Sequence, residues 1–312
     1  YTTASDMAET HKRGGGVGVD LSSLRPNRAK VNNAARTSVG PVGFMELYST
    51  TTGIIGQGGR RGALMLTMND DHADIVEFIK SKRNTTSVRH ANISVKISDA
   101  LIKAVRDDNV WHLKWYGGER ENMIRARFLW DELILGATNY AEPGCLFWDT
   151  IKRYSLSDIY DDGQVVSTNP CGEQPLEPYG ACCLASVNLS KFVAYPFTKD
   201  ATVMWGLLEN AVKFTVRFLD NVLTWNEGKH ALAAQGVQAE MLRRIGVGIT
   251  GFADMLCQLC IVYGNDRSIG FANTLSECIK IWAYEESCQL AMTRGAFPLY
   301  HMAHFDNPFF LS

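Results

Sequence analysis

Apolar and polar side chains alternate most regularly over residues 91–98, where the odd positions are apolar and the even positions are polar. A period of two predicts a β-strand with unlike faces. Ser98 or Asp99 then caps a helix that begins near Ala100.

Strands and helices also alternate through the rest of the chain. In the first half the pattern predicts a strand over residues 16–21, a turn over 25–28, a helix over 42–55, a buried strand over 63–68 and a helix over 75–79. In the second half it predicts a helix over residues 208–223, a strand over 245–249 and a helix over 274–292. No internal repeat or linker interrupts this order, so a single α/β domain is the simplest interpretation.

Composition indicates a soluble, globular chain. The 312 residues are 46% hydrophobic, and 31 basic against 33 acidic side chains give a formal net charge of -2. Without a clustered basic excess, a general nucleic-acid surface is not expected. The most apolar window, residues 246–264, contains Asp254 and Gln258, so we expect a buried element and no membrane anchor. Eight cysteines without tight spacing fit thiols in a reducing cytoplasm.

Three further motifs have plain structural explanations. Residues 246–251 match a dinucleotide-binding glycine pattern, but no clear acidic ribose ligand follows, so close strand–helix packing explains them better. Cys257 and Cys260 have redox or metal spacing, yet their apolar, helical setting favours buried structural thiols. The seven histidines lack ligand spacing, and we expect no protein-bound metal.

The strongest chemical signal is the segment Asn169-Pro170-Cys171-Gly172-Glu173. Its Pro and Gly resist regular structure, and alternate residues of an extended segment share a face, so an amide, a thiol and a carboxylate can converge on one small substrate. Cys182 and Cys183 follow with further thiols that can exchange electrons. From spacing alone, a catalytic thiol and a packed thiol beside a capping carboxylate are roughly equally favoured.

The letters around this segment strongly resemble the catalytic finger loop of the ribonucleotide reductase large subunit. The segment continues as Gln174-Pro175-Leu176, and Pro178-Tyr179-Gly180-Ala181-Cys182 and Ser186-Val187-Asn188-Leu189 follow it. Residues 12–26, 58–63, 83–90 and 244–248 also occur in the family's order, so the resemblance spans nearly the whole chain.

The resemblance implies a ten-stranded α/β barrel, built from two half-barrels of five parallel strands around a central finger loop. Residues 1–312 would form a single, partial barrel domain. Residues 1–165 would approximate the first half-barrel with effector-binding loops, and residues 166–312 would hold the finger loop and part of the second half-barrel. The implied reaction reduces a ribonucleotide to a 2′-deoxyribonucleotide through a radical at C3′.

Residue roles follow from the same resemblance. Cys171 matches the thiyl carrier that removes the 3′-hydrogen, Glu173 the general base on the 3′-hydroxyl, and Asn169 a residue that orients the substrate hydroxyls. Cys182 matches one member of the redox dithiol that closes to a disulfide, and it is favoured over its neighbour Cys183.

Further residues match binding positions of the family. The backbone at Gly15 and Gly16 has room to approach the substrate, and Pro170 borders the same site. Arg25 matches a contact to an effector phosphate, because guanidinium pairs well with phosphate. A specificity loop that senses a deoxynucleoside triphosphate or ATP corresponds to Arg83, Asn84, Thr85, Thr86, Ser87 and Arg89.

The resemblance also implies cofactors and partners. Residues 58–62 and 174–176 look most similar to the adenosylcobalamin-dependent class, in which homolysis of the cobalt–carbon bond generates the radical. A radical supplied by a separate metal-containing subunit is the alternative. Thioredoxin or glutaredoxin is implied as the reductant, together with a homodimer and no membrane or nucleic-acid partner.

The ends of the sequence suggest a fragment. The chain opens at Tyr1, and no cysteine precedes Cys145, although the family's other reducing cysteine lies upstream of the glycine-rich strand. We therefore expect this chain not to turn over by itself. Two other functions stay open: a hydrolase with Cys171 as nucleophile, which needs a histidine as base, and a nucleotide-binding regulatory remnant without activity.

Overall fold

The computed structural model describes residues 1–115, 122–160 and 163–302. Contacts divide the described residues into two compact units, the first over Tyr1–Tyr179 and the second over Gly180–His301. The boundary between the two expected half-barrels, near residue 165, stays a prediction.

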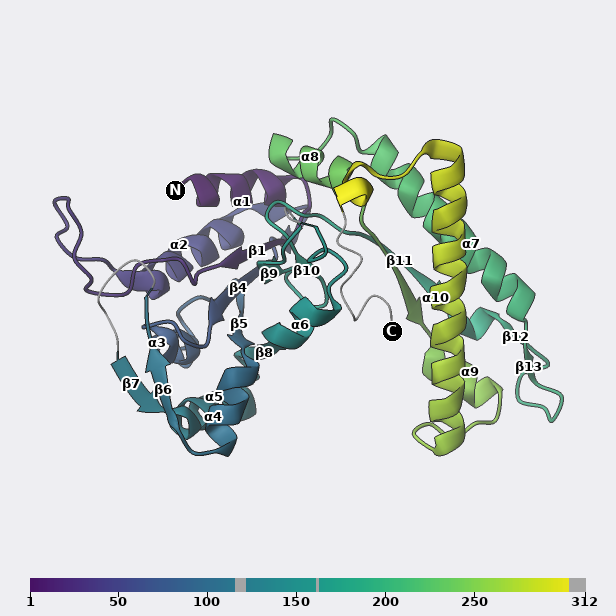
Figure 1. The fold of residues 1–312 in the computed structure, drawn as a ribbon, viewed down its shortest axis with the longest axis horizontal. Coiled ribbons are helices and arrows are strands. Elements are labelled where there is room, and N and C mark those ends of the chain that lie inside the picture. Colours follow the sequence, from purple (N-terminus) through teal and green to yellow (C-terminus); the bar gives the residue numbers. More distant parts are fainter. Residues whose placement is uncertain (116–121, 161–162, 303–312) are drawn as a thin grey trace. The chain divides into compact units, whose positions relative to one another are not determined.

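The first unit is built on a parallel sheet whose four strands follow one another in chain order (Figure 1). Strands β1, β4, β5 and β8 are neighbours in that sequence, and every pairing is parallel. A sheet that adds each new strand at the same edge is wound in one direction, as in a barrel, whereas a doubly wound sheet reverses its order. The α/β class is therefore confirmed, and the closed ten-stranded barrel stays a prediction.

The elements of this unit agree closely with the sequence pattern. Ser98 caps α4 by accepting a hydrogen bond from the backbone N–H of Leu101, as expected. The bounds are α1 Thr2–Lys12, β1 Val17–Asp20, α2 Gly40–Ile54, β2 Gly56–Gln57, β3 Arg60–Arg61, β4 Leu64–Asn69, α3 Ile75–Lys80, β5 Asn92–Ile97, α4 Asp99–Arg106, β6 Val110–Leu113, β7 Asn122–Arg125, α5 Ala126–Tyr140, β8 Gly144–Phe147, α6 Trp148–Tyr154, β9 Ser167–Thr168 and β10 Pro175–Leu176.

One face of the sheet packs against helices α2 to α5 and forms the core of the unit. Each fully buried aliphatic or aromatic side chain there contributes about 1.5–3 kcal/mol to folding. The core residues of β4 and β5 are Leu64, Leu66, Met68, Ile93, Val95 and Ile97, and they cluster with Met45, Phe78, Leu101 and Leu129 of the helices.

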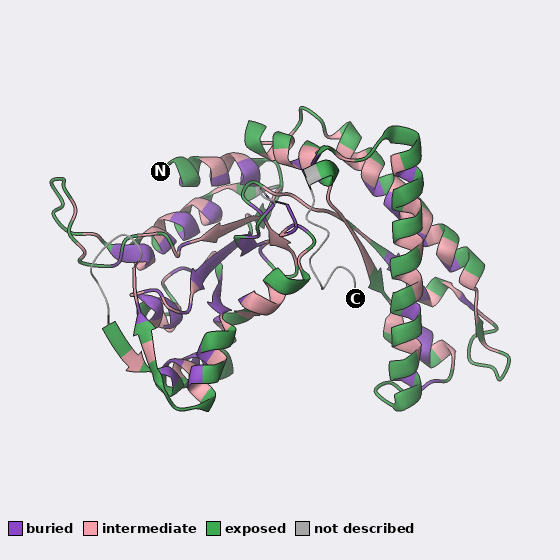
Figure 2. Ribbon diagram, viewed as in Figure 1, coloured by how far each residue is buried: buried purple, intermediate pink, exposed green. Residues whose placement is uncertain are grey.

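The opposite face of the same strands is polar, yet it is also buried. Ser94 is 4% exposed and Lys96 is 6% exposed, and β4 and β5 are coloured as buried along most of their length in Figure 2. The alternation in the sequence correctly predicts two unlike faces. The polar face is nevertheless covered by protein, and the covering segment contains the predicted catalytic cysteine.

The second unit combines the parallel pair β11 and β14 with two long helices. Leu208 and Val212 of α7 pack with Met255 and Leu275 in its core. Among the described residues no helix, α7 and α10 included, is both long and apolar enough to cross a membrane. The bounds are β11 Cys183–Asn188, η1 Leu189–Lys191, β12 Val193–Ala194, β13 Thr202–Val203, α7 Trp205–Trp225, α8 Ala233–Leu242, β14 Ile245–Thr250, α9 Phe252–Gln258, α10 Asp266–Arg294 and η2 Pro298–Met302.

Helix α10 begins eight residues before the point that its apolar pattern predicts. Asn265 precedes its first turn and accepts a hydrogen bond from the backbone N–H of Ser268. A polar cap of this kind starts a helix without any apolar periodicity, which explains the difference.

Candidate functional site

Residues 166–176, called the thiol loop from here on, form a small hairpin. Strands β9 and β10 pair antiparallel at its base. At its tip the N–H of Gly172 donates to the carbonyl of Asn169, and Gly172 has a φ of 87°, a conformation that side chains disfavour. The tip therefore requires a glycine directly after Cys171.

The hairpin brings three of the predicted catalytic residues together. The side-chain amide of Asn169 donates to a carboxylate oxygen of Glu173 at 2.5 Å, and its own oxygen accepts from the N–H of Gln174 at 3.0 Å. Cys171 lies between them as a free, exposed thiol. The amide and the carboxylate are thus held together at the tip of the hairpin, which also carries a sulfur that a substrate can reach.

The first arm of the thiol loop crosses β1 at very short range. A Cβ atom added to Gly18 would lie 1.8 Å from the carbonyl oxygen of Thr168, and one added to Gly16 would lie 2.5 Å from Pro170 Cγ. The loop runs antiparallel to β1, because rising loop numbers face falling strand numbers. Gly16, which the sequence places beside the substrate, is therefore also needed for packing against Pro170. Gly15 has a similar constraint, since its added Cβ would lie 2.8 Å from Thr10 Cγ2.

The polar face of the sheet holds the same arm by side-chain hydrogen bonds. Lys96 Nζ lies 2.7 Å from Asp20 Oδ1 and donates to the carbonyl of Val166 at 3.3 Å. Thr67 donates to Asp20 at 3.2 Å and is bonded to the Ser167 hydroxyl at 3.0 Å. Burial lowers the pKa of Lys96, and the Asp20 carboxylate opposes that shift.

A further side chain of the sheet holds the loop next to the catalytic position. The amide of Asn92, the first residue of β5, donates to the carbonyl of Pro170 at 2.8 Å. Sequence reasoning did not assign Asn92, Lys96, Thr67 or Asp20 to the site. The available signal was the polar half of the alternating pattern, which shows that a face is polar without showing what covers it.

The two later cysteines lie in the second unit, at the start of β11. Cys182 and Cys183 are both partly buried thiols outside any disulfide, and burial raises the pKa of Cys183. The Sγ atom of Cys182 lies 4.0 Å from the carbonyl oxygen of Cys183. The choice of Cys182 as the reducing thiol stays a prediction.

The predicted specificity loop, residues 83–89, is fixed at its ends and open in its middle. Arg83 donates to a carboxylate oxygen of Glu132 at 2.5 Å, and the N–H of Val88 donates to Glu46 at 2.9 Å. Asn84 accepts from both the N–H and the hydroxyl of Thr86 in a local turn. The exposed members of the loop are Asn84, Thr85, Thr86 and Arg89, and Ser87 is half-buried.

Arg25, the predicted phosphate contact, is exposed and lies in the loop that precedes α2. Its guanidinium carbon is 5.5 Å from the centroid of the Trp115 ring. An exposed guanidinium stacked on an indole keeps its hydrogen-bond donors available.

The motif Cys257-Gln258-Leu259-Cys260 differs from its predicted setting. Both of its cysteines are exposed, so the prediction of buried structural thiols is wrong. Helix α9 ends at Gln258, and Cys260 adopts a φ of 55° in the turn that follows. The apolar residues of the segment, Met255 and Leu256, point into the core, while the cysteines occupy the other side of the helix end.

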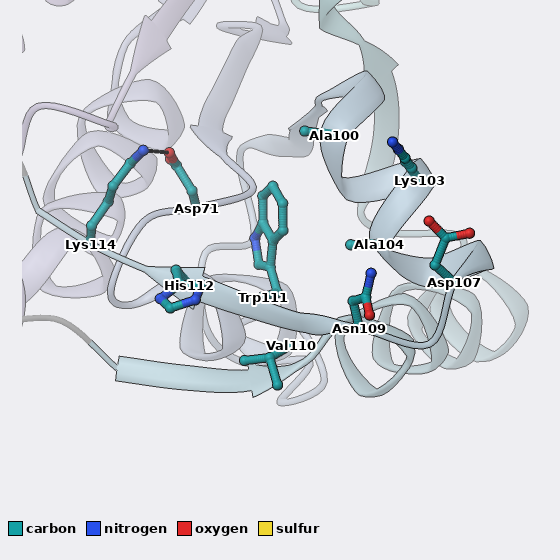
Figure 3. A pocket seen from close by; sticks show the side chains of 10 residues that line it. All are labelled: Asp71, Ala100, Lys103, Ala104, Asp107, Asn109, Val110, Trp111, His112 and Lys114. Carbon is teal, nitrogen blue, oxygen red and sulfur yellow. Dashed lines mark ion pairs between the residues drawn. The ribbon is translucent and has the colours of Figure 1, made fainter.

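The described residues include no group of three or more His, Cys, Asp or Glu side chains suited to a metal ion. They do include a hollow of about 330 Å³ between α4 and β6 (Figure 3). In Figure 3, Trp111 points into this hollow between Asp71, which pairs with Lys114, and the side chains of Lys103 in α4 and of Asp107 directly after it. None of the residues predicted for catalysis or binding lines it, so the thiol loop is the better candidate site.

Comparison with known proteins identifies the family. Residues 1–310 match the model of the ribonucleotide reductase barrel domain. The chain belongs to that family, which confirms the resemblance seen in the sequence.

Individual relatives agree with this assignment. Over 311 residues the chain is 35% identical to the vitamin B12-dependent ribonucleoside-diphosphate reductase of Mycobacterium tuberculosis, covering 98% of this chain and 43% of that protein. The protein of the same description from Thermoplasma acidophilum is 37% identical over 309 residues, covering 98% and 39%. The ribonucleoside-diphosphate reductase subunit alpha of Chlamydia trachomatis is 27% identical over 348 residues, covering 98% and 32%. The chain thus spans about two fifths of the length of the B12-dependent relatives.

Proposed function

We propose that this chain is the catalytic barrel segment of a reductase that converts ribonucleoside diphosphates to 2′-deoxyribonucleoside diphosphates. The observation that carries the proposal is the tip of the thiol loop, where the Asn169 amide and the Glu173 carboxylate are hydrogen-bonded beside the exposed Cys171 thiol. The diphosphate level follows the names of the relatives.

The chemistry needs each of these groups. The 2′-hydroxyl is a poor leaving group, and a radical at C3′ weakens the neighbouring C–O bond. Cys171, as a thiyl radical, removes the 3′-hydrogen atom and later returns it. Glu173 accepts the 3′-hydroxyl proton, a contribution of about 10²–10⁴-fold for general base catalysis. Asn169 fixes the carboxylate and orients the substrate hydroxyls.

The overall step is balanced by a dithiol. The ribose loses its 2′-hydroxyl as water and gains a hydrogen, while two thiols supply two electrons and close to a disulfide. Cys182 is the proposed member of that pair in this chain. Thioredoxin or glutaredoxin then reduces the disulfide.

The residues present are suited to a radical of external origin. Cys171 is exposed at the tip of a hairpin, so its hydrogen atom is accessible to an oxidising radical. Adenosylcobalamin, when bound, supplies that radical by homolysis of its cobalt–carbon bond. The two relatives named as vitamin B12-dependent support this cofactor over a separate radical subunit.

Effector binding completes the proposal. The open middle of the specificity loop and the exposed Arg25 are the proposed contacts for a deoxynucleoside triphosphate or ATP, in a homodimer. Family membership supports the reductase over a regulatory remnant. A Cys-nucleophile hydrolase has less support, because the described bonds of His11, His72 and His90 go to groups other than Cys171.

The decisive experiment uses the complete reading frame that contains this chain. The purified protein is incubated with a ribonucleoside diphosphate and a dithiol, with and without adenosylcobalamin, and deoxyribonucleotide is quantified. Product only with the cofactor is the expected result. Product that instead requires a second protein subunit contradicts the cofactor, and no product under either condition contradicts the reductase.

A further inference from the structure

Side chains from three neighbouring strands meet under the first arm of the thiol loop. Asp20 ends β1, Thr67 lies in β4 and Lys96 lies in β5. The register of the sheet places all three near the carboxyl ends of their strands. Their hydrogen bonds form one connected chain, in which the Asp20 carboxylate accepts from both Lys96 and Thr67. The two ends of this series of hydrogen bonds reach the thiol loop, one at the Val166 carbonyl and the other at the Ser167 hydroxyl.

This arrangement costs folding free energy, because it buries a charged group beneath the loop. Lys96 is 6% exposed and Thr67 is fully buried. Removing the Lys96 ammonium group from water costs free energy that its attraction to Asp20, whose side chain is 24% exposed, only partly returns. Apolar residues of similar volume commonly stabilise a protein as well or better. Stability alone therefore gives no reason for a lysine at this position.

The arrangement does provide a fixed geometry. An apolar contact allows the loop to slide, whereas an ammonium group that reaches both Asp20 and the Val166 carbonyl fixes the height of the loop on the sheet. The ring of Trp148, whose centroid is 4.8 Å from Lys96 Nζ, limits movement from another side. Cys171 is only five residues beyond Val166, so the position of the thiol depends on this anchor.

We propose that Lys96 is a positioning residue, which with Asp20 and Thr67 holds the first arm of the thiol loop so that Cys171 meets its substrate at the reacting distance. The proposal rests on the proposed reductase function. It assigns no contact between Lys96 and the substrate. A shift of the thiol by about 1 Å is enough to cost roughly 10²-fold in rate.

The test compares Lys96→Met with Lys82→Met in the complete reductase. Lys82 is a matched control, because it also pairs with a carboxylate, Glu142 at 2.6 Å, and donates to a backbone carbonyl, Ala91 at 2.6 Å, but does not touch the thiol loop. Each variant is assayed for kcat and KM without effector, for its thermal midpoint, and for amide hydrogen exchange of residues 166–176.

The expected result is specific to Lys96. Lys96→Met lowers kcat by roughly 10- to 100-fold, leaves KM within about 3-fold, and speeds exchange in the thiol loop, while Lys82→Met changes neither kcat nor loop exchange by more than about 3-fold. A kcat in Lys96→Met within 3-fold of wild type, or unchanged loop exchange, overturns the proposal.

Two further variants separate positioning from simple structural support. Adding Asp20→Asn to Lys96→Met removes the unpaired carboxylate, so the thermal midpoint should recover while kcat stays low; recovery of both overturns the proposal. If Lys96→Met does not fold, Ser167→Ala is tested in its place, because it removes only the hydroxyl at the other end of this series of hydrogen bonds. Ser167→Ala should lower kcat and speed amide exchange in the thiol loop. If the wild-type protein has no reductase activity, the reductase function is contradicted instead. Amide exchange in the thiol loop then still tests whether Lys96 anchors the loop.

Discussion

The thiol loop and the specificity loop belong to the same unit but are held in opposite ways, the first by the sheet and the second by helices α5 and α2. The thiol loop is held along its whole first arm, by hydrogen bonds at Val166, Ser167 and Pro170 and by the contact of Thr168 with Gly18. The specificity loop is held only near its ends, and its middle is exposed. The proposed hydrogen-atom transfer needs one fixed distance, whereas the proposed sensing of different nucleotides needs freedom to adjust.

Removing the thiol should have the largest effect and should test whether the held loop is the reactive one. We expect Cys171→Ala to lower the rate of reduction by about 10⁴-fold or more, because the thiol proposed to carry the radical is lost. The free energy of unfolding should change by less than about 0.5 kcal/mol, because the thiol is exposed. Product formation and denaturant unfolding of the complete protein measure these quantities.

The control for that variant is Cys288→Ala, at another exposed thiol in α10. It should keep full activity. Reduction by Cys171→Ala at a rate near that of the control would contradict the assignment of the radical to Cys171.

The next largest effect should follow from pushing the thiol loop away from the sheet. Gly18→Ala places a Cβ 1.8 Å from the carbonyl oxygen of Thr168. The clash is with a backbone atom, which cannot rotate away as a flexible side chain would. We expect kcat to fall by about 10²-fold and unfolding free energy to fall by about 1–3 kcal/mol. Steady-state kinetics and thermal unfolding measure both changes.

Gly270→Ala is the matched control for this substitution. Among the described residues no atom lies within 4 Å of the added Cβ, and Gly270 is inside α10. Alanine there should stabilise the protein by up to about 1 kcal/mol through helix propensity. Equal effects of the two variants would mean that the close approach of β1 and the loop does not matter.

These contacts also show how far the sequence reaches. Strong periodicity correctly predicted β5 and α7, because a period of two or 3.6 reports directly which residues face the core. A continuous apolar run predicted β4, and a capping residue predicted the start of α4. The spacing of an extended segment predicted that Asn169 and Glu173 converge. They do meet within hydrogen-bonding distance, but through the turn at Gly172 and not along an extended segment. Both successes concern residues close together in the chain.

The features that escaped prediction depend on residues far apart in the chain. Lys96 and Val166 are separated by 70 positions, and no local pattern indicates that the polar face of β5 receives a loop. The exposure of Cys257 and Cys260 had the same origin, because their apolar neighbours predicted burial for the whole segment although only one side of the helix end packs inward.

The sheet under the thiol loop should respond to pH through Asp70, the residue directly after β4. Burial raises the pKa of Asp70 from 3.8 to about 6, although hydrogen bonds from Ser98 oppose this shift. The folded state then holds a proton more tightly than the unfolded chain, so this group's contribution is most favourable below about pH 3.8 and is lost as the pH rises through about 6. The loss is at most about 3 kcal/mol, at 1.36 kcal/mol per pH unit.

Asp70→Asn isolates this contribution, because asparagine keeps an oxygen that can accept a bond from Ser98 but does not titrate. The difference in unfolding free energy, wild type minus variant, should fall between pH 4 and pH 7. Amide exchange of the thiol loop should follow that change, since the loop is fastened to the sheet. A flat difference across this range would rule out a raised pKa for Asp70.

The smallest effect should come from the open part of the specificity loop. Arg89 is exposed, so Arg89→Ala should change unfolding free energy by less than about 0.5 kcal/mol. Loss of one charge-assisted hydrogen bond to a triphosphate should raise the Kd of a deoxynucleoside triphosphate by about 10-fold. Calorimetric titration of the complete protein measures this change.

Arg83→Ala should behave differently, because Arg83 is committed to Glu132 at the fixed end of the loop, and it should lower unfolding free energy by about 1–3 kcal/mol. Equal stability losses in the two variants would contradict the difference between the anchored Arg83 and the exposed Arg89.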